Sequence, residues 1–469
     1  MSPREPRGEE YFGKLNAGRE PLDELAANHL VLASETRIKA EQRSEGKCIV
    51  VGTKGSGKTD LRRMVEHHAT GWVFTADADR PVLVLDEPDV SLSPLRLQHA
   101  LAFSLIEAML RTLAQEQPSL KDRFDELRHR ALDLLQSTVQ KIEYASPVGL
   151  FRFSDLTRTT VNEAVHRAWR NSVDEIVKRR KNRAAVLLLD DVDTVIPGTA
   201  DQPNLLEGVF HAVQAINDYA GSALHVLVFV KHGPWRNVFE NQVEYDKVKS
   251  RVEFLQWTPD HLEDLIAMRI ASIHGLDHDV GSVDSRRKLW AKEFDITSKA
   301  AYRRIAGELT RHCVNGPRDM IDLCNLVGHY SGRRKATPEA LEEILPTYSE
   351  EKLFSISADF GSSFPDLQHF ILQVLRDAPV EAGGDQYVDL VDQNAYQNDQ
   401  VDDVYRKHRW YNLNAPAGIV RLLYEVGFFG LVVEGDVSYV MERPRIRQDQ
   451  LLSNPLRIHP AFLPYLGSA

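Results

Sequence analysis

The stretch that most constrains this chain is Gly52 to Thr59, which reads GTKGSGKT and follows the apolar run of residues 48–51. It matches the pattern GxxxxGK(S/T) at every fixed position. Such a stretch is typical of a loop between a buried strand and a helix, where backbone N–H groups and the helix dipole hold a phosphate. We therefore predict a phosphate-binding loop here, with a strand ending at Val51 and a helix over residues 60–68.

This motif assigns a chemical role to two of its residues. Lys58 is expected to reach the β- and γ-phosphates of a nucleotide, and the Thr59 hydroxyl is expected to bind Mg²⁺. The predicted nucleotide-binding residues are Gly52, Thr53, Lys54, Gly55, Ser56, Gly57, Lys58, Thr59 and Asp60. The predicted cofactors are ATP and Mg²⁺.

A second motif begins with six apolar residues, 184–189, and continues with Asp190, Asp191, Val192 and Asp193. A continuous apolar run is typical of a parallel strand that is buried on both faces, and ligands bind at the carboxyl ends of such strands. We expect Asp190 to be a second Mg²⁺ ligand and Asp191 to polarise the attacking water as a catalytic residue. The alternative is that these acids only cap the following helix.

Two further apolar runs predict strands of the same sheet. Residues 81–88 end in Asp-Glu-Pro. The chain between the loop and the end of this run is long enough for one helix and one return strand, so we expect the second strand there. Residues 224–230 form another strand, which ends at Lys231 and His232. Either side chain is a candidate sensor of the γ-phosphate.

Length and composition narrow the class of protein. At 469 residues, two or three domains are expected, and 43% apolar with 27% charged residues is typical of a soluble globular protein. A net charge of −11 argues against non-specific coating of nucleic acid. No apolar run approaches the roughly 18 residues of a membrane span, and no secretory leader follows Met1, so a cytoplasmic protein without a membrane partner is expected.

The three cysteines, Cys48, Cys313 and Cys324, are scattered along the chain. Their spacing fits neither a disulfide framework nor a metal site. We therefore expect three free thiols.

Periodicity and turn signals divide the chain into segments. Helices are expected over residues 93–116, 161–181, 205–219, 299–312 and 317–330. A polar linker is expected over 346–364 because of its Gly-Ser-Ser break. We predict an N-terminal segment over residues 1–45, an α/β core over 46–257 with a helical insertion at about 93–145, a helical lid over 258–348, a winged-helix domain over 365–445, and a C-terminal tail over 446–469.

The winged-helix prediction rests on three helices followed by a hairpin. The helices are expected over residues 366–376, 387–396 and 415–426, and the strands over 428–433 and 437–441. An acidic residue and a glycine between the strands fit a tight turn.

The order of these motifs, together with KSRVEFLQWTPDHLEDLIAMRI and NGPRDMIDLCNLV, resembles the AAA+ and STAND-type P-loop ATPases. Origin-recognition initiators and bacterial ATPases associated with phage defence are the members it is similar to. The resemblance covers about residues 48–327. It implies an α/β P-loop NTPase core with a parallel sheet and an all-α lid. It also implies two catalytic residues: Arg251 as an arginine finger for a neighbouring subunit, and Arg318 as a sensor arginine.

The resemblance also implies a function. We expect a Mg²⁺-dependent ATPase, made slow by an aspartate at position 191, that acts as a switch or remodeller. A homo-oligomer and a protein partner or effector are expected, with phage defence as the setting. One alternative is an initiator-like protein that binds duplex DNA through its winged helix, with the basic and aromatic residues 406–411 as the candidate contact. Another is a degenerate P-loop scaffold that does not hydrolyse ATP.

Overall fold

A computed structural model of the chain describes residues 8, 10–15, 20–29, 46–69, 71–76, 94–116, 126, 162–179, 185–190, 192, 202–239, 248–276, 282–314, 316–361, 364–440, 442–443 and 446–467. The chain divides into two compact units. The sheet unit consists of Val31–Gly52 and Lys58–Leu255, and the helical unit consists of Met1–Leu30, Thr53–Gly57 and Gln256–Ala469.

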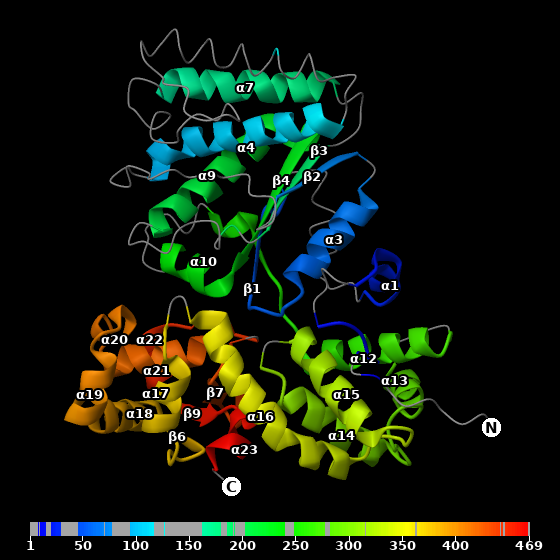
Figure 1. Ribbon diagram of the computed structural model, residues 1–469. Helices are drawn as coiled ribbons and strands as arrows, with labels where there is room; N and C mark the ends of the chain where they lie inside the picture. Colours follow the sequence, from blue (N-terminus) through cyan, green and yellow to red (C-terminus); the bar gives the residue numbers. More distant parts are fainter. Residues whose placement is uncertain are drawn as a thin grey trace. The chain divides into compact units, whose positions relative to one another are not determined.

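The sheet unit is built on a five-stranded, wholly parallel sheet (Figure 1). In the order in which they pair, its strands are β2 (Trp72–Ala76), β3 (Ala185–Leu189), β4 (Leu224–Lys231), β1 (Ile49–Gly52) and β5 (Val252–Phe254). All residues of β1 and β3 are buried, which explains why both strands read as unbroken apolar runs. The predicted parallel α/β sheet is confirmed.

Helices cover both faces of this sheet. Helix α3 (Lys58–His68) lies on one face, where Leu61 and Val65 pack with Leu188 and Phe229. The opposite face carries α4 (Pro94–Glu116), α7 (Asn162–Arg179), α9 (Gln202–Ala220) and α10 (His232–Phe239). Strand β1 continues into α3 and its neighbour β4 continues into α10, so the two connections leave the sheet toward opposite faces. This place is a topological switch point, and α/β sheets bind ligands at such points.

The second strand lies earlier in the chain than we expected. It is Trp72–Ala76, which follows α3 directly, whereas residues 81–88 lie outside the described part of the chain. This strand is only half-buried and carries a threonine, so its sequence has a weaker apolar signal than the other strands. The expected fourth strand and the helices over 93–116, 161–181 and 205–219 are found. The short helices η3 (Gly221–Ala223) and η4 (Lys249–Arg251) precede β4 and β5.

Helices dominate the first part of the helical unit, as predicted for a lid. They are α1 (Leu22–Ala27), α12 (Pro259–Ile273), α13 (Val283–Trp290), α14 (Lys299–Arg311), α15 (Pro317–Ser331) and α16 (Pro338–Phe360). The predicted linker over residues 346–364 is wrong for most of its length, because α16 continues to Phe360. Two of its residues with polar side chains are buried and bonded: the Tyr348 hydroxyl donates to the His312 carbonyl, and Lys352 pairs with Asp319 at 2.9 Å.

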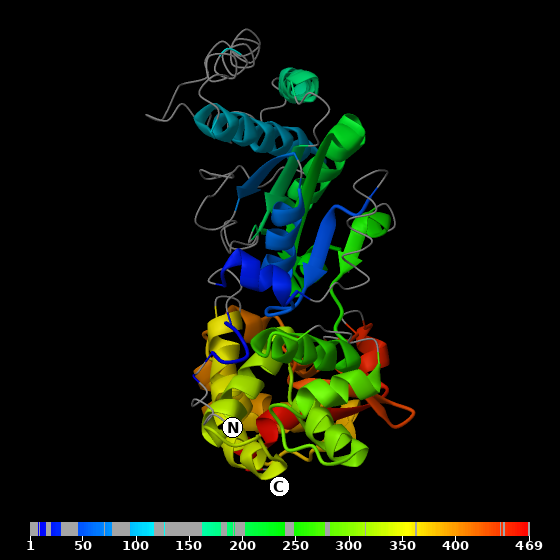
Figure 2. The same ribbon diagram turned by 90° about the vertical axis from the view of Figure 1, so that its right-hand side faces the viewer.

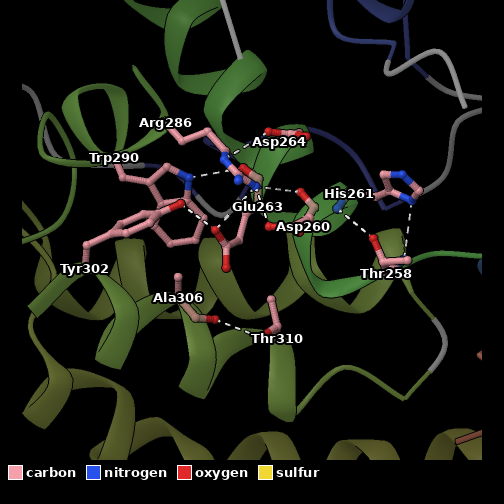
Figure 3. A network of polar contacts seen from close by, with 10 residues as sticks. All are labelled: Thr258, Asp260, His261, Glu263, Asp264, Arg286, Trp290, Tyr302, Ala306 and Thr310. Carbon is pink, nitrogen blue, oxygen red and sulfur yellow. Dashed lines mark hydrogen bonds and ion pairs between the residues drawn. The ribbon is translucent and has the colours of Figure 1, made fainter. Parts of the chain in front are cut away.

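One arginine joins α13 to the start of α12 (Figure 3). Arg286 lies 2.9 Å from Asp260, 3.6 Å from Glu263 and 3.3 Å from Asp264, all measured between guanidinium nitrogens and carboxylate oxygens. Burial raises the pKa of Glu263 and of Asp264, and the guanidinium opposes that shift. Thr258 caps the same helix end, so the beginning of α12 is fixed from two sides.

The C-terminal part combines short helices with a four-stranded antiparallel sheet. The helices are α17 (Leu367–Val374), α18 (Gly384–Val391), the π-helix η5 (Asp392–Tyr396), α19 (Asp399–Tyr405), α20 (Arg409–Asn412), α21 (Pro416–Glu425), α22 (Gln448–Leu452), η6 (Pro460–Phe462) and α23 (Leu463–Leu466). The strands pair in the order β6 (Glu381–Gly383), β9 (Pro455–Ile458), β7 (Phe429–Val433) and β8 (Asp436–Ser438). The predicted hairpin is confirmed as β7 and β8.

Residues 446–469 are more than the tail we expected. They contain β9, which lies between β6 and β7 in this sheet. Leu456 and Ile458 are fully buried, but two alternating apolar residues are too short a pattern to predict a strand.

Two expectations about the whole chain can be compared with the structure. Cys48, Cys313 and Cys324 are buried free thiols. Among the residues described, no helix combines the length and apolar character that a membrane crossing requires.

Candidate functional site

The phosphate-binding loop connects β1 to α3 and depends on its glycines. Gly55 and Gly57 have φ angles of 81° and 89°, a region that side chains rarely adopt. Within the helical unit, the Trp257 indole N–H donates to the Ser56 carbonyl at 2.9 Å, and this contact is buried. Trp257 therefore helps to hold the loop, a role that the sequence did not indicate.

The first turn of α3 positions the two residues to which the motif assigns chemistry. Lys58 Nζ donates to the Gly52 carbonyl at 2.9 Å, and Thr59 Oγ1 donates to Asp190 Oδ2 at 3.1 Å. Asp190 directly follows β3 and is 4% exposed, and its N–H donates to the Ala76 carbonyl at 2.8 Å. This bond continues the pairing of β2 with β3 and fixes the backbone that carries the carboxylate. The predicted Thr59 and Asp190 are thus brought together.

These two oxygens fit a magnesium site. Mg²⁺ takes oxygen ligands at about 2.1 Å in octahedral geometry, which places neighbouring ligands roughly 3 Å apart. The 3.1 Å between Thr59 Oγ1 and Asp190 Oδ2 matches that separation. A hydroxyl and a carboxylate are also the hard donors that Mg²⁺ prefers. The residues therefore fit the metal that the motif implies.

Arg62 is a third contributor, and the sequence analysis did not identify it. Its Nε donates to Asp190 Oδ2 at 3.1 Å, the same oxygen that Thr59 contacts, and its Nη1 lies 3.4 Å from Glu66. The side chain is buried. Arg62 is four residues after Lys58 and so lies on the same face of α3, which is the signal that could have indicated it. The Arg62 guanidinium would therefore compete with a bound Mg²⁺ for the Asp190 carboxylate.

The end of β4 lies next to this site. Lys231 pairs in register with Gly52, so its backbone is adjacent to the start of the loop. His232 is 5% exposed, and its ring meets Phe254 edge-on with 6.4 Å between ring centroids. Of the two candidate sensors, Lys231 occupies the better position, whereas His232 packs in the core. A sensor role stays a prediction.

Arg251 lies at the other end of the strands. It precedes β5, its carbonyl accepts from the Cys48 N–H at 2.9 Å, and its guanidinium donates to Asp218 at 2.6 Å. Since β1 and β5 are parallel, Arg251 is one strand length, roughly 13 Å, from the carboxyl ends where Lys58 lies. The structure therefore does not bring Arg251 to the nucleotide residues of its own sheet unit.

Two further predicted catalytic residues, Arg318 and Asp191, stay untested. Arg318, on α15 of the helical unit, is half-buried and donates from Nε to the Leu15 carbonyl at 3.1 Å. Asp191 lies outside the residues that the structure describes. Their roles stay predictions, as does the contribution of Asp60 in the first turn of α3.

Comparisons with known proteins do not assign a function to this site. No protein-family model matches the chain, and no curated protein is similar to it in sequence. Among solved structures, the chain is similar to the Orc1 protein of Aeropyrum pernix in complex with DNA, with 12% identity, 96% of both chains covered and a TM-score of 0.36. A TM-score this low does not establish a common fold. We therefore base the assignment of function on the residues of this chain.

Proposed function

We propose that this chain is a Mg²⁺-dependent ATPase of the P-loop type. The observation that carries the proposal is the pairing of Thr59 with buried Asp190 beside a glycine-dependent loop, at a switch point of a parallel sheet. Lys58 would exchange its bond with the Gly52 carbonyl for the β- and γ-phosphates. Thr59 and Asp190 would hold Mg²⁺, which when bound neutralises charge on the phosphates.

The proposed reaction needs a group that orients water. Asp191 is the next residue after Asp190 and is our candidate for that role. Its side chain is one methylene shorter than the glutamate of many fast ATPases, so we expect slow turnover, which suits a switch.

Loss of hydrolysis in two variants tests the enzymatic part. Lys58→Ala should weaken ATP binding, because the phosphates lose a cation, whereas Asp190→Asn should retain ATP and lose hydrolysis, because one Mg²⁺ ligand is weakened. Phosphate release measures turnover, and equilibrium binding of a fluorescent ATP analogue measures affinity. A wild-type protein that binds ATP without any turnover would instead identify a degenerate scaffold.

We further propose that ATP controls assembly. Arg251 lies at the amino end of the strands, away from the nucleotide residues of its own sheet unit, and we propose that it acts on the site of another copy. An arginine supplied across a subunit boundary neutralises charge that develops on the transferred phosphoryl group. A homo-oligomer that regulates a protein partner or effector follows, with a cytoplasmic location. Phage defence is the setting that the resemblance of the motifs suggests.

The mass of the protein in solution, with and without ATP and Mg²⁺, tests this assembly. Wild type should form a larger species with ATP, and both Lys58→Ala and Arg251→Ala should prevent it. Asp218→Ala is the matched control, because it breaks the same ion pair but keeps the guanidinium. A monomer in every condition would exclude an arginine finger.

Duplex DNA binding through a C-terminal winged helix is the alternative, and the ion pairs of its basic stretch weigh against it. Arg406 pairs with Asp402, while Lys407 and His408 lie 3.6 and 3.0 Å from Asp366. Cations that are already neutralised release few counterions from DNA.

The aromatic residues of that stretch are also unavailable for stacking on bases. Trp410 and Tyr411 are 5% and 1% exposed, and the Trp410 indole donates to the Pro365 carbonyl. We expect no salt-dependent binding of a duplex oligonucleotide at physiological ionic strength. Binding whose affinity falls steeply with salt would favour the initiator-like function instead.

A further inference from the structure

A cavity lies among the helices of the sheet unit, away from the predicted phosphate-binding loop. Helices α4, α7 and α9 line this cavity of about 370 Å³, which is open to solvent, on the face of the sheet opposite α3. Figure 2 shows α7 end-on beside α4, and Figure 1 shows both along their length. The lining includes His99, His166, Trp169, Arg170, His211 and Tyr219. Cavities of this size hold small molecules.

Three nitrogens of the lining residues are buried without a hydrogen-bond partner: Trp169 Nε1, His99 Nδ1 and His211 Nε2. Trp169 is 1% exposed and His211 is 8% exposed. Glu207 lies 3.5 Å from His211 Nε2 but does not satisfy it with a hydrogen bond. Leaving a buried donor unsatisfied costs about 1–3 kcal/mol, so a ligand that accepts from these groups would relieve that cost.

The Arg170 guanidinium is the group in the cavity lining that can attract a negative ligand. The Arg170 guanidinium stacks on Tyr219, 4.6 Å from its ring centroid, and within the described part of the chain no carboxylate pairs with it. The nearby acids are already engaged. Asp218 accepts from Arg251 at 2.6 Å, and Asp174 accepts from the Tyr219 hydroxyl at 3.0 Å. Arg170 therefore lines the cavity without a direct ion pair to a described carboxylate.

The histidines do not make this a metal site. Among the residues that the structure describes, no group of three or more His, Cys, Asp or Glu side chains is arranged to hold a metal ion. Burial, with His166 and Arg170 nearby, lowers the pKa of His99 to about 4, so its ring is neutral at pH 7. Neutral imidazoles offer one N–H donor each, which suits a ligand with acceptor oxygens.

We propose that this cavity is a second ligand site, which takes a small anion bearing carboxylate or phosphate groups. The Trp169 N–H and the Arg170 guanidinium donate to the oxygens of the anion, and the histidine rings supply further donors. A guanidinium that is already stacked on an aromatic ring loses little freedom when it binds such oxygens. The site does not depend on ATP binding.

Isothermal titration calorimetry with inorganic phosphate and with citrate, at constant ionic strength, tests the proposal. The titrated protein carries Lys58→Ala, so that the phosphate-binding loop lacks its lysine. We expect saturable binding of at least one probe, weakened at least tenfold by Arg170→Gln. Arg167→Gln is the matched control, since Arg167 is an exposed arginine of the same helix outside the cavity lining. It should change affinity less than twofold.

A second variant separates the hydrogen bond from the charge. Trp169→Phe keeps an aromatic ring and removes the N–H, so it should weaken binding several-fold. Arg170 is exposed, so its substitution tests the site even where Trp169→Phe fails to fold. Binding of phosphate alone or citrate alone would identify the recognised group. Failure of both probes to bind, or equal weakening by Arg170→Gln and Arg167→Gln, would overturn the proposal.

Discussion

At the scale of single residues, Arg62 decides how the candidate site responds to metal. Its guanidinium contacts Asp190 Oδ2, the oxygen that Mg²⁺ would use. We predict that Arg62→Met lowers the Mg²⁺ concentration needed for half-maximal ATP binding by about tenfold, because a competing cation is removed. In EDTA the same variant should lose about 2 kcal/mol of unfolding free energy, since a buried carboxylate loses its counterion.

Two measurements check this prediction. Titration of Mg²⁺ into protein with a fluorescent ATP analogue gives the metal dependence, and urea unfolding in EDTA gives the stability. Arg63→Met, at the neighbouring arginine on α3, is the control and should leave the Mg²⁺ dependence unchanged. A loss of Mg²⁺-dependent ATP binding in Arg62→Met would show that Arg62 assists the metal rather than competing with it.

The burial of His459, in the helical unit, predicts how stability depends on pH. The ring is fully buried: Nε2 lies 3.2 Å from the Cys313 carbonyl, and Nδ1 accepts from the Ala461 N–H. Burial lowers the pKa of His459 to about 3, from 6.5 in an unfolded chain. The folded state therefore disfavours the proton, so stability present above pH 6.5 is lost as the pH falls below that value.

We expect this proton to remove about 2 kcal/mol of unfolding free energy between pH 7 and pH 5. His459→Gln should be less stable at pH 7, because the two ring contacts are disturbed, but should lose less on acidification. Urea unfolding of both proteins at the two pH values measures the difference. Equal losses in the two proteins would mean that His459 does not titrate in this range.

At the scale of elements, the cluster around Arg286 holds α12 to α13. Removing one partner of a buried ion pair is strongly destabilising, so we predict that Arg286→Met lowers the unfolding free energy by about 3 kcal/mol at pH 7. The deficit should shrink at pH 5, because Glu263 and Asp264, whose pKa burial raises, then take up protons. Arg287→Met is the control, because Arg287 lies 3.6 Å from only one acid, Asp284.

Chemical denaturation at the two pH values checks this prediction. Arg287→Met should change the free energy by less than 1 kcal/mol, the usual size for a surface pair. An Arg286→Met deficit that stays constant from pH 7 to pH 5 would indicate that lost packing, rather than unpaired carboxylates, causes it.

The sequence predicts elements well where the signal is local. The loop and its strand were recognisable because glycine, lysine and threonine stand in a fixed pattern, and Asp190 because it ends an apolar run. Arg62 was not recognisable as a site residue, because its contact with Asp190 exists only once α3 and β3 are packed. The same reason applies to α16. In the sequence, Lys352 is typical of a polar linker, and its ion pair with Asp319 exists only in the folded chain.

At the scale of the whole molecule, the proposal that Arg251 acts on another copy predicts that a complete site needs two copies of the chain. Lys58→Ala retains its arginine but should bind ATP weakly, whereas Arg251→Ala should bind ATP but offers no arginine. Each variant alone should therefore lack hydrolysis, since an arginine finger contributes about 10³- to 10⁵-fold to the rate. An equimolar mixture should regain turnover, because the intact arginine of one copy then meets the ATP of the other.

The rate of phosphate release by the mixture, measured over a range of total protein concentration, checks this prediction. Recovered activity should rise more steeply than in proportion to concentration, because assembly precedes catalysis. A mixture of Lys58→Ala with Asp190→Asn is the control, since both changes damage the same site and no pairing of these chains restores it. Arg251→Ala that is fully active alone would place Arg251 outside catalysis and leave its bond to Asp218 as its role.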